Sequence, residues 1–136
     1  THNYLNLILG HDEIRRQDPN AWALLLDHNG NLCEGLGSNI FLVDDGVLYT
    51  PQDRYVLCGV SRETVVGLAA DAGMEVVKTD LDLYDAHAAD EAFITSTSFC
   101  ICPVATINHV PFGEVNIPGP VTKSLTKAYC DFVNRG

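Results

Sequence analysis

The sequence predicts a single α/β domain with a mainly antiparallel sheet. Two hairpin signals support this fold class. Asn29-Gly30 and Asp45-Gly46 each separate short apolar runs, and Asn-Gly in particular favours a tight turn between paired strands. Later stretches instead carry apolar residues at helical spacing. Hairpins mixed with helices are typical of an α/β domain, and 136 residues suffice for one such domain with a buried core.

Four segments are predicted to be helical. In the first, apolar residues recur at helical spacing from Tyr4 to Leu9, and Asn3 can cap the helix. The second is followed by Gly73, a residue type that commonly ends helices. The third is a short turn or helix, and the fourth opens at Gly119-Pro120. These segments are residues 1–16, 61–72, 84–89 and 119–133.

Short apolar runs bounded by turn residues are predicted to be strands. The second strand returns antiparallel to the first after the turn at 28–30, which leaves Glu34 at a strand end. Pro103 cannot donate a ladder hydrogen bond, so the last strand is predicted to lie at an edge or to be irregular. The predicted strands are residues 21–27, 31–34, 40–43, 47–50, 75–79, 91–95 and 100–107.

The charge and apolar content exclude two classes of function. A net charge of −10 argues against a nucleic-acid binder and against docking on anionic membranes. No apolar stretch is long enough to span a bilayer, and the first residues do not resemble a signal peptide. We therefore expect a cytoplasmic protein that binds neither nucleic acid nor membrane.

The five cysteines form no disulfide framework. Cys100 and Cys102 would point to one face of a strand, so a metal site is conceivable there. Histidines and cysteines elsewhere do not fall at zinc spacings, however. We expect free thiols in a reducing cytoplasm and no bound metal.

A small-residue loop follows Glu34 and leads into an apolar strand. Phosphate-binding glycine loops open a helix, so this is neither a P-loop nor a dinucleotide fingerprint. Gly35 and Gly37 carry no Cβ, which lets another group approach the backbone beside a fixed carboxylate. The alternative is a hairpin loop with a solvated glutamate.

Two further loops carry groups that suit an anion. Gly59 and Ser61 lead directly into a helix, where free amides, the helix dipole and a hydroxyl can bind phosphate, although Ser61 could be only an N-cap. The stretch 95–98 is a hydroxyl-rich strand end, or simply a polar loop. Together with Glu34 they suggest a ligand with a phosphate and a protonatable nitrogen. Pyridoxal phosphate is such a ligand, because a carboxylate keeps its pyridine nitrogen protonated.

These motifs resemble those of class IV (fold type IV) pyridoxal-phosphate aminotransferases, which include branched-chain and D-amino-acid aminotransferases and aminodeoxychorismate lyase. The resemblance extends in order and spacing over nearly the whole chain. It implies the C-terminal domain of a D-amino-acid-aminotransferase-like fold, a mainly antiparallel mixed sheet or pseudobarrel flanked by helices. The matching motifs are Glu34-Gly35-x-Gly37-Ser38-Asn39-Ile40-Phe41, Asp45-Gly46-Val47-Leu48-Tyr49-Thr50-Pro51, Gly59-Val60-Ser61-Arg62 and Thr95-Ser96-Thr97.

The resemblance also implies roles around the cofactor ring. Glu34 would pair with the pyridine nitrogen and Leu57 would pack on the ring. Tyr4, in a segment similar to the one that follows the family's Schiff-base lysine, would lie near the phenolic oxygen.

At the phosphate, the resemblance implies a second group of contacts. Gly59 belongs to the binding loop, and Val60 and Ser61 would bind phosphate through amides and a hydroxyl. Thr97 would add a phosphate contact, and Thr97-Ser98 would present amides to the substrate carboxylate.

By the same resemblance, the Schiff-base lysine is expected just before Thr1. Lys78, Lys123 and Lys127 match none of the family's motif positions, so no catalytic residue is expected within the chain. Residues 1–136 would be one domain, the C-terminal cofactor-binding domain of a larger two-domain enzyme. Its partners would be its own N-terminal domain, which carries a phosphate-binding arginine, and a second copy in a homodimer.

The implied reaction is transamination between an amino acid and a 2-oxo acid, with a branched-chain L-amino acid favoured and a D-amino acid possible. Elimination of the aminodeoxychorismate lyase type is an alternative within the family, and an inactive cofactor-binding fragment is another. A third alternative makes Thr1 an N-terminal nucleophile whose own amine serves as the base.

Overall fold

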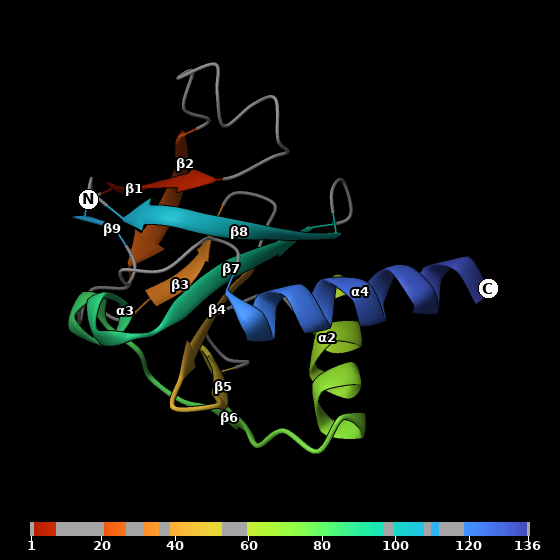
Figure 1. Ribbon diagram of the computed structural model, residues 1–136. Helices are drawn as coiled ribbons and strands as arrows, with labels where there is room; N and C mark the ends of the chain where they lie inside the picture. The colour runs from red at the N-terminus through yellow and green to blue at the C-terminus, as the bar shows by residue number, and fades with distance from the viewer. Residues whose placement is uncertain are drawn as a thin grey trace.

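The computed structural model describes residues 2–7, 21–26, 32–35, 39–52, 60–96, 100–107, 110–111 and 119–135. Strands and helices alternate irregularly along the chain (Figure 1). The elements are β1 (His2–Leu7), β2 (Ala21–Leu26), β3 (Leu32–Gly35), β4 (Asn39–Asp44), β5 (Val47–Thr50), α2 (Val60–Asp71), β6 (Val76–Lys78), α3 (Leu83–Ala88), β7 (Glu91–Ser96), β8 (Cys100–Ile107), β9 (Val110–Pro111) and α4 (Pro120–Arg135).

The described strands form one nine-stranded sheet with the order β3-β2-β1-β8-β7-β4-β5-β6, and β9 pairs with β8. Strands β5 and β6 pair in parallel, and every other pairing among the described strands is antiparallel. The predicted α/β class with a mainly antiparallel sheet is therefore confirmed. Among the described residues, no helix is long and apolar enough to span a membrane.

The hairpin between β4 and β5 follows directly from its turn residues. Asp45 and Gly46 have φ values of 51° and 77°, and Asp44 pairs with Val47 across them. Two consecutive positive φ values give the turn whose twist matches paired strands, and glycine adopts such a value without strain. The other predicted turn, at residues 28–30, lies outside the described residues, although β2 and β3 pair antiparallel as expected.

The helix predicted over residues 1–16 is wrong at its start, because His2–Leu7 is strand β1. This strand pairs antiparallel with β2 on one side and with β8 on the other. Leu5 and Leu7 alternate with Asn6, a period-two signal in the same stretch as the helical one. Pairing with two neighbours outweighs a weak local helix preference. Residues 8–16 lie outside the described residues.

Strand β8 is irregular, as Pro103 predicted, but it is not an edge strand. It lies between β7 and β1, and its register with β1 shifts between Asn6 and Leu7. Pairing with β1 covers Val104 to Ile107, whereas Pro103 lies opposite Phe93 of β7. The proline is tolerated because it lies just outside the β1 ladder.

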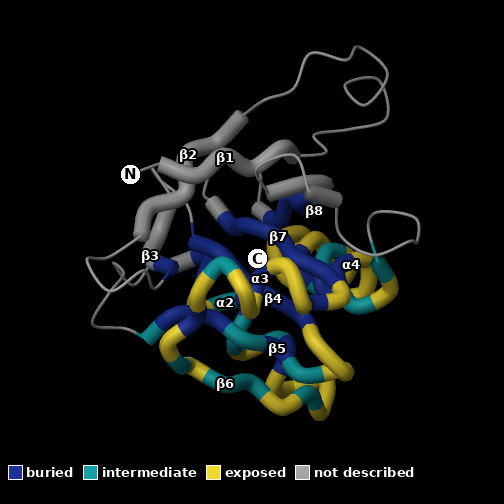
Figure 2. Tube along the Cα trace, turned by 90° about the vertical axis from the view of Figure 1, so that its left-hand side faces the viewer, coloured by how far each residue is buried: buried dark blue, intermediate teal, exposed yellow. Residues whose placement is uncertain are grey.

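Both faces of the central strands β4 and β7 are buried, as the dark-blue tubes of Figure 2 show. One face packs against α3. Alternate residues along a strand point to opposite faces, so a continuous apolar run such as 40–43 supplies both. The cluster on the α3 side comprises Leu32, Ile40, Leu42, Leu81, Ala86, Ala89, Ala92, Ile94, Cys102 and Val104.

The opposite face packs against α2 and α4. The Phe41 and Phe93 rings stack at its centre with centroids 5.0 Å apart and an angle of 12° between the planes. The cluster comprises Phe41, Val43, Leu48, Val65, Ala69, Phe93, Ile101, Leu125 and Tyr129.

The helix ends agree with the sequence signals. Gly73 has φ 84° just beyond α2, and the short α3 is a helix whose start is closed by a capping box between Asp82 and Asp85. The start of α4 is held by Glu91 of β7. The Glu91 carboxylate accepts bonds from the amides of Val121 and Thr122, at 3.1 and 2.8 Å, and from the Thr122 hydroxyl at 2.7 Å. This buried carboxylate fixes α4 to the sheet.

Candidate functional site

Helix α2 begins at Val60, which makes Ser61 its second residue. The amides of the first helical turn have no partner within the helix, and the helix dipole adds positive potential there. Ser61 is buried, with 5% of its surface exposed. Its hydroxyl oxygen accepts a hydrogen bond from the Tyr129 hydroxyl of α4 at 3.0 Å. The structure thus places Ser61 inside the helix with a partner from another helix, which differs from the N-cap alternative.

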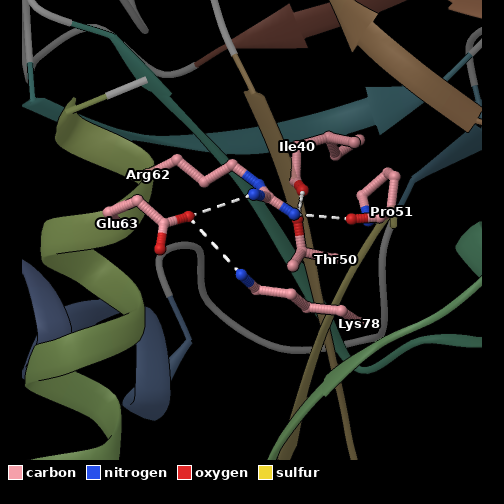
Figure 3. Close-up of polar contacts among 6 residues, drawn as sticks. All are labelled: Ile40, Thr50, Pro51, Arg62, Glu63 and Lys78. Atoms are coloured by element: carbon pink, nitrogen blue, oxygen red, sulfur yellow. Dashed lines mark hydrogen bonds and ion pairs between the residues drawn. The ribbon is translucent and has the colours of Figure 1, made fainter. Parts of the chain in front are cut away.

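Arg62, the next residue, is completely buried. Its Nη2 donates to the Pro51 carbonyl oxygen at 2.6 Å, and its Nη1 lies 3.1 Å from Glu63 Oε2. Lys78 of β6 lies 3.5 Å from the same carboxylate oxygen, as Figure 3 shows. Arg62 therefore joins the residue that follows β5 to the start of α2. The residues between them include Leu57 and Gly59 of the predicted site.

A further hydrogen bond fixes the end of β5. The Thr50 hydroxyl donates to the Ile40 carbonyl oxygen at 2.8 Å, and the Thr50 side chain is completely buried (Figure 3). The chain thus enters the predicted phosphate loop from a fixed point on β4 and β5. It leaves that loop into α2 at a point fixed by Arg62.

Thr95 lies near the end of β7, two residues before Thr97, and pairs with Asn39 of β4. Its side chain is fully buried, and its hydroxyl has no hydrogen-bond partner within the part of the chain that the structure describes. Buried hydroxyls are rarely left unpaired in folded proteins unless a bound molecule or a water supplies the partner. This unpaired donor at the strand end fits a ligand with oxygen acceptors, such as a phosphate ester.

The sheet order arranges the remaining predicted positions. Glu34 lies at the end of β3 and Tyr4 lies in β1, on either side of β2. Asn3, Leu24 and Gly35 form one row across these three strands, so Tyr4 and Glu34 are both adjacent to that row. Tyr4 is paired with Ala23 on one side of this row and Glu34 lies on its other side, so the two backbones are two strand spacings apart across the sheet and two residues apart along it, roughly 12 Å in all. That distance suits contacts with different atoms of one small ligand.

The structure describes the predicted site residues to different extents. Ser61 is described in full, whereas Tyr4, Glu34 and Val60 are placed by their backbones in β1, β3 and α2. The predicted site residues that lie outside the described residues are Leu57, Gly59, Thr97 and Ser98.

Sequence reasoning missed the supporting residues of this site. Tyr129 follows Leu125 by four residues on the apolar face of α4, so it looks like an ordinary core residue. Arg62 carries a charge and looks like a surface residue, yet it is among the largest fully buried side chains described. Neither residue had a sequence signal that identified its partner.

Metal chemistry has no support in the described part of the chain, where no group of three His, Cys, Asp or Glu side chains could hold an ion. Of the cysteines described with side chains, Cys102 is buried and Cys130 is exposed.

The model of the amino-transferase class IV family matches residues 1–107. The chain belongs to this family. A branched-chain-amino-acid aminotransferase from Pseudomonas aeruginosa is 39% identical over 112 residues, which cover 82% of this chain and 36% of that protein.

Solved structures of similar proteins agree with this assignment. The branched-chain amino acid aminotransferase of Escherichia coli matches with a TM-score of 0.78 and 36% identity, over 90% of this chain and 41% of that one. The enzyme of the same name from Thermobaculum terrenum, solved in its PLP form, matches with a TM-score of 0.79 and 34% identity, over 90% and 40%. The predicted family and fold class are confirmed. The chain spans about two-fifths of the length of these relatives.

Proposed function

We propose that the protein containing this chain is a pyridoxal-phosphate-dependent aminotransferase. It transfers the amino group between a branched-chain L-amino acid and a 2-oxo acid. Family membership and the branched-chain aminotransferases similar to this chain support this reaction. They do not favour elimination of the aminodeoxychorismate lyase type. Residues 1–136 are proposed to be the C-terminal cofactor-binding domain, which acts together with an N-terminal domain and as part of a homodimer in the cytoplasm.

The buried Ser61 near the start of α2 is the observation that carries the cofactor proposal. When bound, pyridoxal phosphate supplies the electron sink for removal of the substrate Cα proton. Ser61 and the amide of Val60 are proposed to hold its phosphate, with Gly59 and Thr97 completing that subsite. The Thr95 hydroxyl at the end of β7, which has no partner among the described residues, supports an anion subsite near that strand end.

At the ring, Glu34 is proposed to hold the proton on the pyridine nitrogen, because a nearby carboxylate favours the charged form of that nitrogen. Leu57 is proposed to pack on the ring and exclude water from one face. Tyr4 is proposed to donate a hydrogen bond to the phenolic oxygen. Thr97 and Ser98 are proposed to orient the substrate carboxylate through their amides.

The experiment is an amino-transfer assay on the full-length protein with a branched-chain L-amino acid as donor and a 2-oxo acid as acceptor. The D-enantiomer and an acidic L-amino acid are the comparison donors. The proposal predicts product formation that is fastest with the branched-chain L-amino acid. Equal or faster turnover of the D-enantiomer would contradict the substrate assignment, and no turnover with any donor would contradict the activity.

A further inference from the structure

The contact between Tyr129 and Ser61 joins two helices that are far apart in sequence. The Tyr129 hydroxyl of α4 donates to the Ser61 hydroxyl oxygen of α2 at 3.0 Å, over 68 residues of chain. Tyr129 is buried, with 7% of its surface exposed, and belongs to the cluster that packs α2 and α4 on the sheet. Figure 1 shows α4 crossing the sheet beside α2. The phenol therefore reaches Ser61 from a fixed direction.

The direction of this bond decides what the Ser61 hydroxyl can still do. A serine hydroxyl has one proton to donate and two lone pairs that accept. Tyr129 occupies one lone pair, so the Ser61 proton is left for another acceptor. Within the part of the chain that the structure describes, no acceptor for that proton is found. A donated bond at the oxygen also polarises the hydroxyl and makes it a stronger donor.

We propose that Tyr129 is a positioning residue that orients the Ser61 hydroxyl to donate its proton to the cofactor phosphate. This role depends on the proposed phosphate contact of Ser61. Hydrogen bonds to a charged acceptor are shorter and stronger than neutral ones, so the anionic phosphate gains most from a correctly aimed hydroxyl. Tyr129 itself touches neither cofactor nor substrate in this arrangement.

The position of Tyr129 depends on contacts that fix the first turn of α4. Glu91 of β7 binds the amides of Val121 and Thr122 in the first turn of α4, and its carboxylate is buried. Tyr129 lies about two turns further along the same helix. The sheet thereby fixes α4, α4 fixes the phenol, and the phenol fixes the Ser61 rotamer.

The test replaces Tyr129 by phenylalanine in the full-length protein and measures the dissociation constants of two ligands. Pyridoxal phosphate should bind roughly three- to tenfold more weakly, the effect of one lost hydrogen bond. Pyridoxal, which lacks the phosphate, should bind as it does to the wild-type protein. The matched control is Tyr84→Phe, which removes a phenol hydroxyl from a residue that is 79% exposed and should change neither constant.

A double-mutant cycle with Ser61→Ala separates this role from a merely structural one. If Tyr129 acts through Ser61, Tyr129→Phe should weaken phosphate-dependent binding only while Ser61 is present. Equal weakening for pyridoxal and pyridoxal phosphate, or a full effect in the Ser61→Ala background, would overturn the positioning role. If Ser61→Ala weakens pyridoxal phosphate binding but Tyr129→Phe does not, the positioning role fails and the proposed function stands. If Ser61→Ala itself changes nothing, the phosphate contact in the proposed function fails as well.

Discussion

The Arg62 guanidinium donates a hydrogen bond from Nη2 to the carbonyl oxygen of Pro51 at 2.6 Å, and the arginine side chain is completely buried. The two residues flank the segment that carries Leu57 and Gly59. A planar guanidinium can bond the carbonyl and Glu63 at once, whereas a lysine ammonium at the same place lacks that fork. The arginine therefore links the residues on either side of the proposed phosphate loop to each other.

The substitution Arg62→Lys should weaken the link between Pro51 and the start of α2 while keeping the positive charge. We expect the free energy of unfolding to fall by about 1.5–3 kcal/mol, the range for a hydrogen bond to a charged group. The cofactor should dissociate more readily as well. Chemical denaturation of the full-length protein measures the first effect, and absorbance during dialysis measures the second.

The control for Arg62→Lys is Lys78→Met, which removes the outer, partly exposed member of the same charge group. Such exposed pairs contribute about 1 kcal/mol or less. An Arg62→Lys protein as stable as Lys78→Met and with unchanged cofactor retention would show that the Arg62–Pro51 bond is dispensable.

The close approach of Gly119 to Glu91 gives a second prediction. A Cβ at Gly119 would overlap the Glu91 side-chain carbons, and that carboxylate cannot move without losing its bonds to α4. Gly119→Ala should therefore lower the free energy of unfolding by about 1–3 kcal/mol.

Gly67→Ala is the matched control for Gly119→Ala. This glycine lies within α2 with nothing within 4 Å of the new Cβ, so alanine should stabilise the helix by about 0.5–1 kcal/mol. Thermal melts that rank the two variants in the opposite order would refute this prediction.

The unpaired hydroxyl of Thr95 gives a third prediction. Thr95→Val replaces a buried donor, which has no partner among the described residues, by a methyl group of similar size. The cofactor-free protein should melt at the same or a higher temperature, because an unsatisfied buried group costs about 1–3 kcal/mol. The gain in melting temperature on adding pyridoxal phosphate should become smaller.

Thr122→Val is the control for Thr95→Val, because the Thr122 hydroxyl donates to Glu91 at 2.7 Å. It should lower the melting temperature of the cofactor-free protein. A Thr95→Val protein that is destabilised as much as Thr122→Val would mean that the Thr95 hydroxyl has a structural partner, contrary to the prediction.

Local signals predicted the strands and turns well where one short stretch determines its own conformation. Asp45-Gly46 forms the predicted tight turn, and Gly73 has the positive φ expected beyond a helix. The error at β1 arose because helical and strand periodicities coexist around Leu5, and the partners that decide between them lie in β2 and β8. A short stretch of sequence around Leu5 does not contain those partners.

The motifs of the candidate site were predicted from the sequence, but the contacts that hold their residues in place were not. Ser61 was recognised from its place before a helix, yet its bond to Tyr129 crosses 68 residues. The burial of Arg62 follows from its link to Pro51 and from the packing of α2 on the sheet. Contacts of this kind depend on the tertiary fold, so the composition and spacing of a motif do not specify them.

Glu34 carries the electronic part of the proposed function. Glu34 lies at the end of β3, and strand β2 separates it from Tyr4 of β1. This place suits a carboxylate that pairs with the pyridine nitrogen. Glu34→Gln should leave the fold and cofactor binding nearly unchanged, because the bound ground state needs little stabilisation from this charge. The rate of amino transfer should fall by at least tenfold, because the negative charge that the protonated ring must accept develops only during the reaction.

The most direct test is the single-turnover half-reaction of the full-length protein with a branched-chain L-amino acid. Absorbance follows conversion of the cofactor from its pyridoxal to its pyridoxamine form in wild type and in Glu34→Gln. We expect rapid conversion by wild type and conversion at least tenfold slower by Glu34→Gln, at equal cofactor occupancy. A Glu34→Gln rate within a few-fold of wild type, or no conversion by wild type, would contradict this expectation.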